Sequence, residues 1–194
     1  SNRNASVGAY GSVAIDLIIT VFILLFSLNF AVYFLLLTRK WREALSSDEL
    51  RFFLLVVTGA TILIAIDIAP LYTSIWESLR YSVFQVASII STTGFATADF
   101  VLWPHFSQTI LVLLMFCGAC AGSTGGGFKV SRVMLLAKSV KRELNRLIHP
   151  RSRTAVTLEG KTIDDATVNG VGCYLALYVA CLIAVFILLC FDSA

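Results

Sequence analysis

The stretch that decides the fold reads Ser91-Thr92-Thr93-Gly94-Phe95-Ala96-Thr97-Ala98-Asp99-Phe100. It lies between two long apolar segments. It carries small hydroxyl side chains, one glycine and few aromatic rings, where a membrane-spanning helix carries Leu and Val. Non-helical backbone is tolerated at membrane depth only where it is buried in protein or lines a water-filled cavity. The stretch therefore predicts a re-entrant turn whose backbone lines such a path.

The composition predicts an all-α integral membrane protein. Of the 194 residues, 58% are hydrophobic and only 14% are charged, whereas a soluble chain is roughly 45–50% apolar. A membrane core of about 30 Å requires roughly 20 apolar residues in a helix. Three runs reach that length, and a fourth is shorter and interrupted by glycine. The three long runs are 13–37, 52–72 and 168–191, and the short one is 106–121.

Basic residues are concentrated in two segments. Apart from Arg3 and Arg80, every Lys and Arg lies either in 39–51 or in 129–161. Cytoplasmic loops carry an excess of Lys and Arg, so both segments are predicted to be cytoplasmic. The N-terminus, residues 71–106 and the C-terminus are then on the outer side. The net charge of +3 reflects these cytoplasmic flanks, and we expect no nucleic-acid partner.

This orientation makes residues 71–106 begin and end on the same side of the membrane. Ser74 and Glu77 have the spacing of a capping box at the start of a helix. The helix that follows, about 74–90, is too short to span and predicts a half-helix ending at the turn. The negative end of its dipole would face the turn, which favours a cation there.

A second unusual feature is the run of glycines after the fourth apolar segment. Four of the six residues in 122–127 are glycine, which makes a continuous helix unfavourable. A nucleotide-binding P-loop is excluded, because Phe128 separates Gly127 from Lys129 and Val130 replaces the hydroxyl residue. We predict a helix over 106–140 that is broken by an intramembrane loop.

Each of three polar side chains has two possible roles. Asn29, in the middle of the first run, either hydrogen-bonds a neighbouring helix or lines an ion path. Asp67 is either a satisfied interfacial residue or a functional carboxylate within the membrane. Asp99 either concentrates cations at a pore mouth or caps the loop.

Other local signals are simpler to interpret. The run Ser46-Ser47-Asp48-Glu49 predicts an N-cap followed by acids in the first turn of the next helix. The segment around 154–163 predicts a small hairpin, after which Asp164 and Asp165 are predicted to start the last helix. The five cysteines lie in apolar helices and are read as small apolar residues, not as a disulfide framework.

Together these motifs resemble the Trk/Ktr/HKT superfamily of potassium transporters, most closely its bacterial Trk branch. The resemblance covers most of the chain. The residues that carry it are STTGF at 91–95, ADF and WP within 98–104, AGSTGGG-F-K at 121–129, and HP at 149–150 before a V-T-L-x-G hairpin.

The resemblance implies four helix–pore loop–helix repeats around one potassium-channel-like pore. Residues 1–50 would hold an outer loop, the outgoing helix of the second repeat and a cytoplasmic loop. Residues 51–145 would form the third repeat, 146–166 a cytoplasmic connector, and 167–194 the first helix of the fourth. The chain is therefore expected to be a piece of a longer protein.

The resemblance also implies roles for individual residues. The selectivity filter, within 91–97, would consist of Thr92, Thr93, Gly94 and Phe95, with potassium held at Thr92 and Thr93. Phe95 stands where potassium channels have Tyr, which implies a shorter filter and argues against very high selectivity over sodium. Asp99 would lie at the pore mouth. The gating loop would comprise Gly122, Ser123, Thr124, Gly125, Gly126 and Gly127, followed by Lys129.

The implied setting is the bacterial inner (plasma) membrane, in contact with lipid. The family implies a homodimer and a cytoplasmic nucleotide-binding regulatory subunit, which we expect to meet Lys138, Lys141 and Arg142. Potassium is the expected ligand, with no covalently bound cofactor. Transport through the pore as a channel or by ion-coupled symport is left open.

Two other classes were weighed. A secondary carrier for a small solute would also have a re-entrant hairpin and a broken helix, but would show inverted repeats, which the order of elements does not. A membrane enzyme or assembly factor would need a nucleophile–base pair or a metal cluster. His105 and His149 are predicted to lie on opposite sides of the membrane, so an enzyme is not expected.

Overall fold

The computed structural model describes residues 6–149, 157–158 and 161–191, and these residues are mostly helical. The chain divides into two compact units, Ser1–Val130 and Ser131–Ala194, which are described separately. The first unit contains the two stretches that the sequence singled out. Its elements are η1 (Ser6–Tyr10), α1 (Val13–Ser27), α2 (Phe30–Leu37), α3 (Trp41–Ser46), α4 (Asp48–Ile68), η2 (Ala69–Leu71), α5 (Ile75–Ile90), η3 (Phe100–Leu102) and α6 (His105–Cys117).

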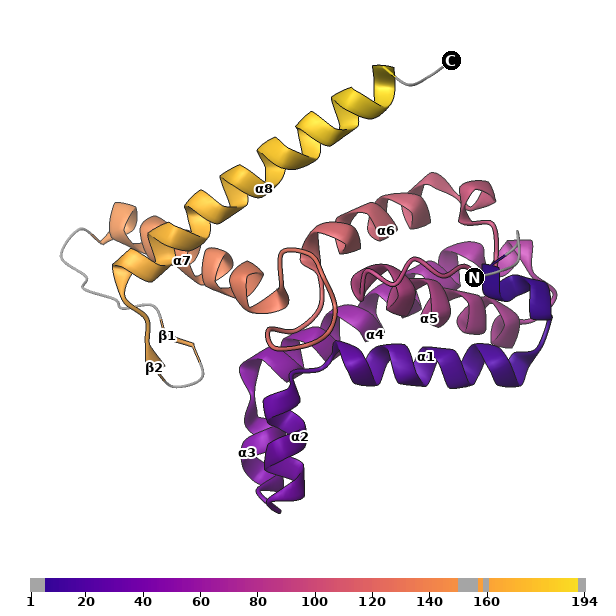
Figure 1. Ribbon diagram of the computed structural model, residues 1–194, viewed down its shortest axis with the longest axis horizontal. Coiled ribbons are helices and arrows are strands. Elements are labelled where there is room, and N and C mark those ends of the chain that lie inside the picture. Colours follow the sequence, from indigo (N-terminus) through magenta and orange to yellow (C-terminus); the bar gives the residue numbers. More distant parts are fainter. Residues whose placement is uncertain (1–5, 150–156, 159–160, 192–194) are drawn as a thin grey trace. The chain divides into compact units, whose positions relative to one another are not determined.

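Helix α5 is the centre of the first unit. It packs against α1, α4 and α6, which lie alongside it in Figure 1. Its side chains Phe84, Val86 and Ile90 are completely buried. Buried serines of α5 are satisfied within the helix, as where the Ser82 hydroxyl donates to the Ser78 carbonyl at 2.6 Å. The apolar core therefore surrounds a helix that leads directly into the 91–100 stretch.

Helix α5 is too short to cross a membrane. Its 16 residues extend about 24 Å, against a hydrocarbon core of about 30 Å. Ser74 caps its start by accepting from the amide of Trp76 at 3.2 Å, as predicted. The reciprocal half of the capping box is not formed, because the Glu77 carboxylate accepts instead from the Thr73 hydroxyl at 3.0 Å.

The prediction of one continuous span over 13–37 is wrong. The run forms two helices, α1 and α2, bent by 91° at Leu28 and Asn29. Both residues have extended backbone, and the Asn29 side chain accepts from the amide of Ala31 at 2.9 Å. A polar residue in the apolar run thus starts a new helix instead of lying inside an old one.

Among the described residues, two helices are long and apolar enough to cross a membrane by length and composition. They lie at Asp48–Leu71 and Asp165–Phe191, and the bent pair α1–α2 would be a third if counted as one span. Ser47 caps the first of them by accepting from the amide of Leu50 at 3.4 Å, as predicted.

The predicted break in the 106–140 helix is present. Helix α6 ends at Cys117, where the amide of Gly118 still bonds the Leu114 carbonyl, and α7 (Val130–Ile148) begins after the twelve residues 118–129. We call residues 118–129 the glycine loop. In Figure 1 it is the irregular loop that joins α6 to α7.

The second unit contains most of α7, a two-stranded hairpin and α8 (Asp165–Phe191). The strands β1 (Thr157–Leu158) and β2 (Lys161–Thr162) pair antiparallel, as the sequence predicts for this segment. Predictions for Pro150, 154–156 and 159–160 lie outside the described residues. A small core of Leu135 and Val168 holds the unit together. Leu158, Ile163 and Val171 pack against it.

Candidate functional site

The chain leaves α5 through a tight cap built on Ser88. The Ser88 carbonyl accepts from the amides of Thr93, at 2.9 Å, and Gly94, at 3.4 Å. The Ser88 hydroxyl donates to the Phe95 carbonyl at 2.6 Å. Thr92 has a φ of 60°, in the left-handed region that is costly for a residue with a Cβ. Residues 91–95 are therefore held in one defined shape by the end of the helix they follow.

Beyond Phe95 the chain returns towards η1. The Ala96 carbonyl accepts from the amide of Gly8 at 3.1 Å, and the Ala96 amide donates to the Ser6 hydroxyl at 3.2 Å. Asp99 caps η3 by accepting from the amide of Val101 at 3.1 Å. Of its two interpretations the capping contact is thus formed, and a role in attracting cations stays a prediction.

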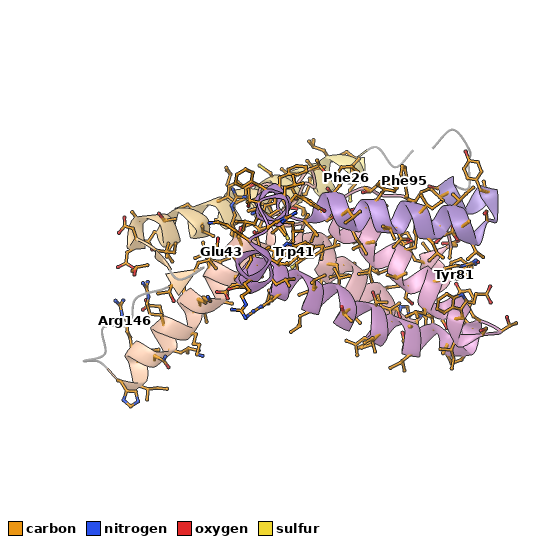
Figure 2. All side chains as sticks on the ribbon, turned by 90° about the horizontal axis from the view of Figure 1, so that it is seen from below. Phe26, Trp41, Glu43, Tyr81, Phe95 and Arg146 are labelled. Carbon is orange, nitrogen blue, oxygen red and sulfur yellow. The ribbon has the colours of Figure 1, made fainter. Side chains whose placement is uncertain are left out.

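Three consecutive carbonyl oxygens of this stretch have no hydrogen-bond donor. Within the part of the chain that the structure describes, none bonds the carbonyls of Thr92, Thr93 or Gly94. The same stretch borders an open groove of about 670 Å³. Phe26 and Phe95, both in its lining, lie on the same side of the unit in Figure 2. The other lining residues are Ile18, Ile19, Phe22, Ile23, Ser27, Ser91, Thr92, Thr93, Thr124 and Gly125.

The glycine loop packs directly against the start of this stretch. The amide of Gly126 donates to the Thr92 hydroxyl at 2.7 Å. A Cβ at Gly126 would lie 2.9 Å from that hydroxyl, and one at Gly125 would lie 2.6 Å from the Ala119 Cβ. A side chain at Gly126 would push the loop away from Thr92, and one at Gly125 would meet Ala119 within the loop, which explains why glycine occupies both positions.

The rest of the loop is held from α1 and from its own end. Thr124 donates through its amide, at 3.3 Å, and through its hydroxyl, at 3.2 Å, to the Phe26 carbonyl at the end of α1. The Lys129 ammonium donates to the Gly125 carbonyl. The positive charge of Lys129 is therefore directed back into the loop.

Glu49 is the site residue that sequence reasoning missed. It was read only as an acid in the first turn of its helix, yet it is 4% exposed. Its Oε1 accepts from the amide of Ala121 at 2.6 Å, and its Oε2 accepts from the Asn29 side chain at 3.2 Å. A carboxylate that borders an apolar span was the available signal. Asn29 thus hydrogen-bonds a neighbouring helix, the first of its two interpretations.

Two other acids in the apolar helices, Asp67 and Asp16, lie beside polar or basic side chains. Asp67 accepts from the amide and hydroxyl of Ser107, at 3.2 and 2.5 Å, which favours the interfacial interpretation. Asp16, which is buried in α1, lies 3.8 Å from Nε of Arg80. Among the described residues, no group of three or more His, Cys, Asp or Glu side chains is placed to hold a metal ion. All five cysteines are free thiols.

Long apolar helices, a buried half-helix and a non-helical stretch beneath it define a helical membrane protein. The chain belongs to the TrkH family, described as cation transport protein, whose model matches residues 1–193. Among its relatives are the Trk system potassium uptake protein TrkH of Halomonas elongata, 36% identical, and TrkG of Escherichia coli, 34% identical. Each match covers 92% of this chain, which spans 38% and 37% of the respective relatives.

A solved structure agrees with this assignment. The crystal structure of the potassium transporter TrkH from Vibrio parahaemolyticus matches all of this chain and 42% of its own length, with a TM-score of 0.89 and 31% identity. The fold described above is therefore that of one part of a TrkH-family protein.

Proposed function

We propose that this chain forms part of a pore that carries potassium across the bacterial inner (plasma) membrane. The observation that carries the proposal is the stretch 92–95, which borders a groove at the end of a half-helix and in which the carbonyls of Thr92, Thr93 and Gly94 accept no hydrogen bond from the described residues. Backbone carbonyls replace the hydration shell of potassium in selectivity filters. Several relatives in the same family are named potassium uptake proteins.

In this proposal Thr92, Thr93, Gly94 and Phe95 form one wall of a selectivity filter. Thr92 and Thr93 contribute carbonyls to potassium. The C-terminal end of α5 directs its negative dipole at the same place, which favours a cation over an anion. Asp99 lies at the outer mouth of the path. One such helix–pore loop–helix repeat, residues 51–145, would join three others to close the ring.

The glycine loop is proposed as the gate. Its residue Gly126 bonds Thr92, and Thr124 and Gly125 lie in the lining of the groove. A segment in this place narrows the path on the cytoplasmic side of the filter. Its glycines allow close approach to Thr92.

The proposed orientation follows the basic segments, with the N-terminus outside and α7 on the cytoplasmic side. Partners would be lipid, a second copy of the protein and a cytoplasmic nucleotide-binding subunit that meets Lys138, Lys141 and Arg142. These three side chains are not equally available for contact with such a subunit. Arg142 pairs with Asp165 at 2.5 Å, and that hydrogen bond raises the pKa of its guanidinium. Lys141 is the most exposed of the three.

The test is potassium uptake by the full-length protein in a bacterial host that lacks its own potassium uptake systems. We expect growth at low external potassium and measurable rubidium uptake. A protein that reaches the membrane and supports neither would contradict the proposal. Replacing Lys138, Lys141 and Arg142 together by Gln should weaken co-purification with a cytoplasmic nucleotide-binding subunit, and unchanged co-purification would remove that contact.

A further inference from the structure

Glu49 is a buried carboxylate at the start of α4 that the pore segment does not use. Both of its oxygens accept hydrogen bonds, one from Ala121 in the glycine loop and one from Asn29 at the α1–α2 bend. Among the described residues, no ion pair includes Glu49. A charge buried without a cationic partner is costly unless hydrogen bonds satisfy it. Glu49 therefore depends on these two contacts, and they depend on Glu49.

Asn29 extends this contact into a joint between three segments. Its Oδ1 caps α2 and would lie 3.1 Å from a Cβ at Gly122. Two backbone hydrogen bonds connect the same segments. The amide of Phe30 donates to the Gly122 carbonyl at 3.2 Å, and the amide of Cys120 donates to the Ser27 carbonyl at 3.1 Å. The start of α4, the α1–α2 bend and residues 120–122 are thus held together at Glu49.

Besides the bonds of Thr124 to Phe26, the glycine loop has two attachments that differ in kind. Residues 120–122 are fixed to the Glu49 joint by a charged side chain and backbone bonds. Residues 125 and 126 rest against Ser91 and Thr92 through one hydrogen bond and close glycine contacts. The first attachment sets where the second can reach, because only three residues separate Gly122 from Gly126.

We propose that Glu49 is a positioning residue for the gate: it fixes residues 120–122 so that residues 124–127 close against Thr92. This inference rests on the proposed function, in which the glycine loop restricts potassium passage. Removing the carboxylate releases the amide of Ala121 and the Asn29 side chain together. The loop then spends less time closed, and basal potassium uptake rises.

The experiment compares Glu49→Gln and Glu49→Ala in the full-length protein. Gln retains an acceptor for Ala121 but turns an amide donor towards Asn29, whereas Ala removes both acceptors. The matched control is Glu43→Gln, because Glu43 of α3 is an exposed acid paired only with Lys40 at 3.4 Å in the part described. Figure 2 labels Glu43, which is exposed.

Two readouts are measured in each variant. One is the initial rate of potassium uptake, normalised to protein in the membrane. The other is the rate at which a thiol reagent modifies Cys120, the buried neighbour of Ala121, in a Cys117→Ala background read by mass spectrometry. Losing a buried hydrogen bond to a charged group should shift both rates by roughly tenfold for Ala and by less for Gln. Glu43→Gln should leave both unchanged.

The possible outcomes distinguish failure of the Glu49 inference from failure of the proposed function. If the Glu49 variants leave the rate of Cys120 modification unchanged, Glu49 does not hold residues 120–122 in place. If Cys120 is modified faster but potassium uptake is unchanged, Glu49 holds the loop but does not position the gate. A wild-type protein that transports no potassium would contradict the proposed function itself. Uptake by the wild-type protein is therefore measured first. If Glu49→Ala does not reach the membrane, the nearly isosteric Glu49→Gln decides.

Discussion

The Thr92 hydroxyl accepts a hydrogen bond of 2.7 Å from the backbone amide of Gly126. The two residues are 34 positions apart, and they belong to the two stretches that the sequence marks as unusual. The same hydroxyl donates to the Ser91 carbonyl at 2.6 Å. Thr92 therefore contributes its carbonyl to the proposed filter and its side chain to the proposed gate. Ion binding and loop position would be coupled through one residue.

Replacing Thr92 by Val should release the Gly126 amide while preserving the shape of the side chain. Loss of a neutral hydrogen bond of about 1 kcal/mol predicts roughly fivefold faster hydrogen exchange at Gly126. Thr92→Ser retains the hydroxyl and should exchange at the wild-type rate. Thr58→Val is the matched control, because the Thr58 hydroxyl bonds only the Leu54 carbonyl of its own helix. Equal exchange in Thr92→Val and wild type would remove the coupling.

Alanine at Gly126 or Gly125 should destabilise the loop. The added Cβ atoms would meet the Thr92 hydroxyl at 2.9 Å and the Ala119 Cβ at 2.6 Å, and neither neighbour is the end of a long flexible chain. Overpacking of this kind costs about 1–3 kcal/mol. Thermal unfolding of the purified protein should therefore shift to lower temperature. Gly59→Ala in α4 is the control, since its Cβ meets nothing within 4 Å and favours the helix. A Gly126→Ala protein as stable as wild type would contradict the close packing.

Local patterns in the sequence were sufficient for the half-helix and the broken helix. Ser74 caps α5, and the residues left before Ser91 are too few to span a membrane. Repeated glycines end α6, because each one weakens a helix by about 1 kcal/mol relative to Ala. These features depend on neighbouring residues in the chain, so they can be read without knowing the fold.

The α1–α2 bend and the burial of Glu49 could not be read in that way. An apolar run of 25 residues with one Asn is compatible with a straight span, and the bend is fixed by contacts of Asn29 with Glu49 and of Phe30 with Gly122. By sequence Glu49 is one of two acids in the first turn of a helix. Its burial depends on Ala121, 72 positions away. Only the tertiary arrangement brings these groups together.

Replacing Gly94 by Ser should lower the preference for potassium over sodium. Gly94 has a φ of 76°, and a residue with a Cβ pays about 1–2 kcal/mol there. The space around it is open, so the strain is relieved by moving the backbone and with it the carbonyls of Thr93 and Gly94. The measurement is the ratio of rubidium to sodium uptake. Gly11→Ser is the matched control, with a φ of 57° and equally open space away from the stretch. A ratio unchanged in Gly94→Ser would show that the filter assignment is wrong.

Deleting residues 125–127 should raise the rate of potassium uptake. The deletion removes the amide that bonds Thr92 and the carbonyl that accepts from Lys129, so the remaining loop is too short to rest against the filter stretch. The Glu49 contact with Ala121 precedes the deletion and should hold the rest of the loop in place. Uptake at saturating potassium, normalised to protein in the membrane, should rise several-fold, while the rubidium-to-sodium ratio changes less than in Gly94→Ser. A deletion variant with wild-type uptake would show that the glycine loop does not limit passage, whatever the filter selects.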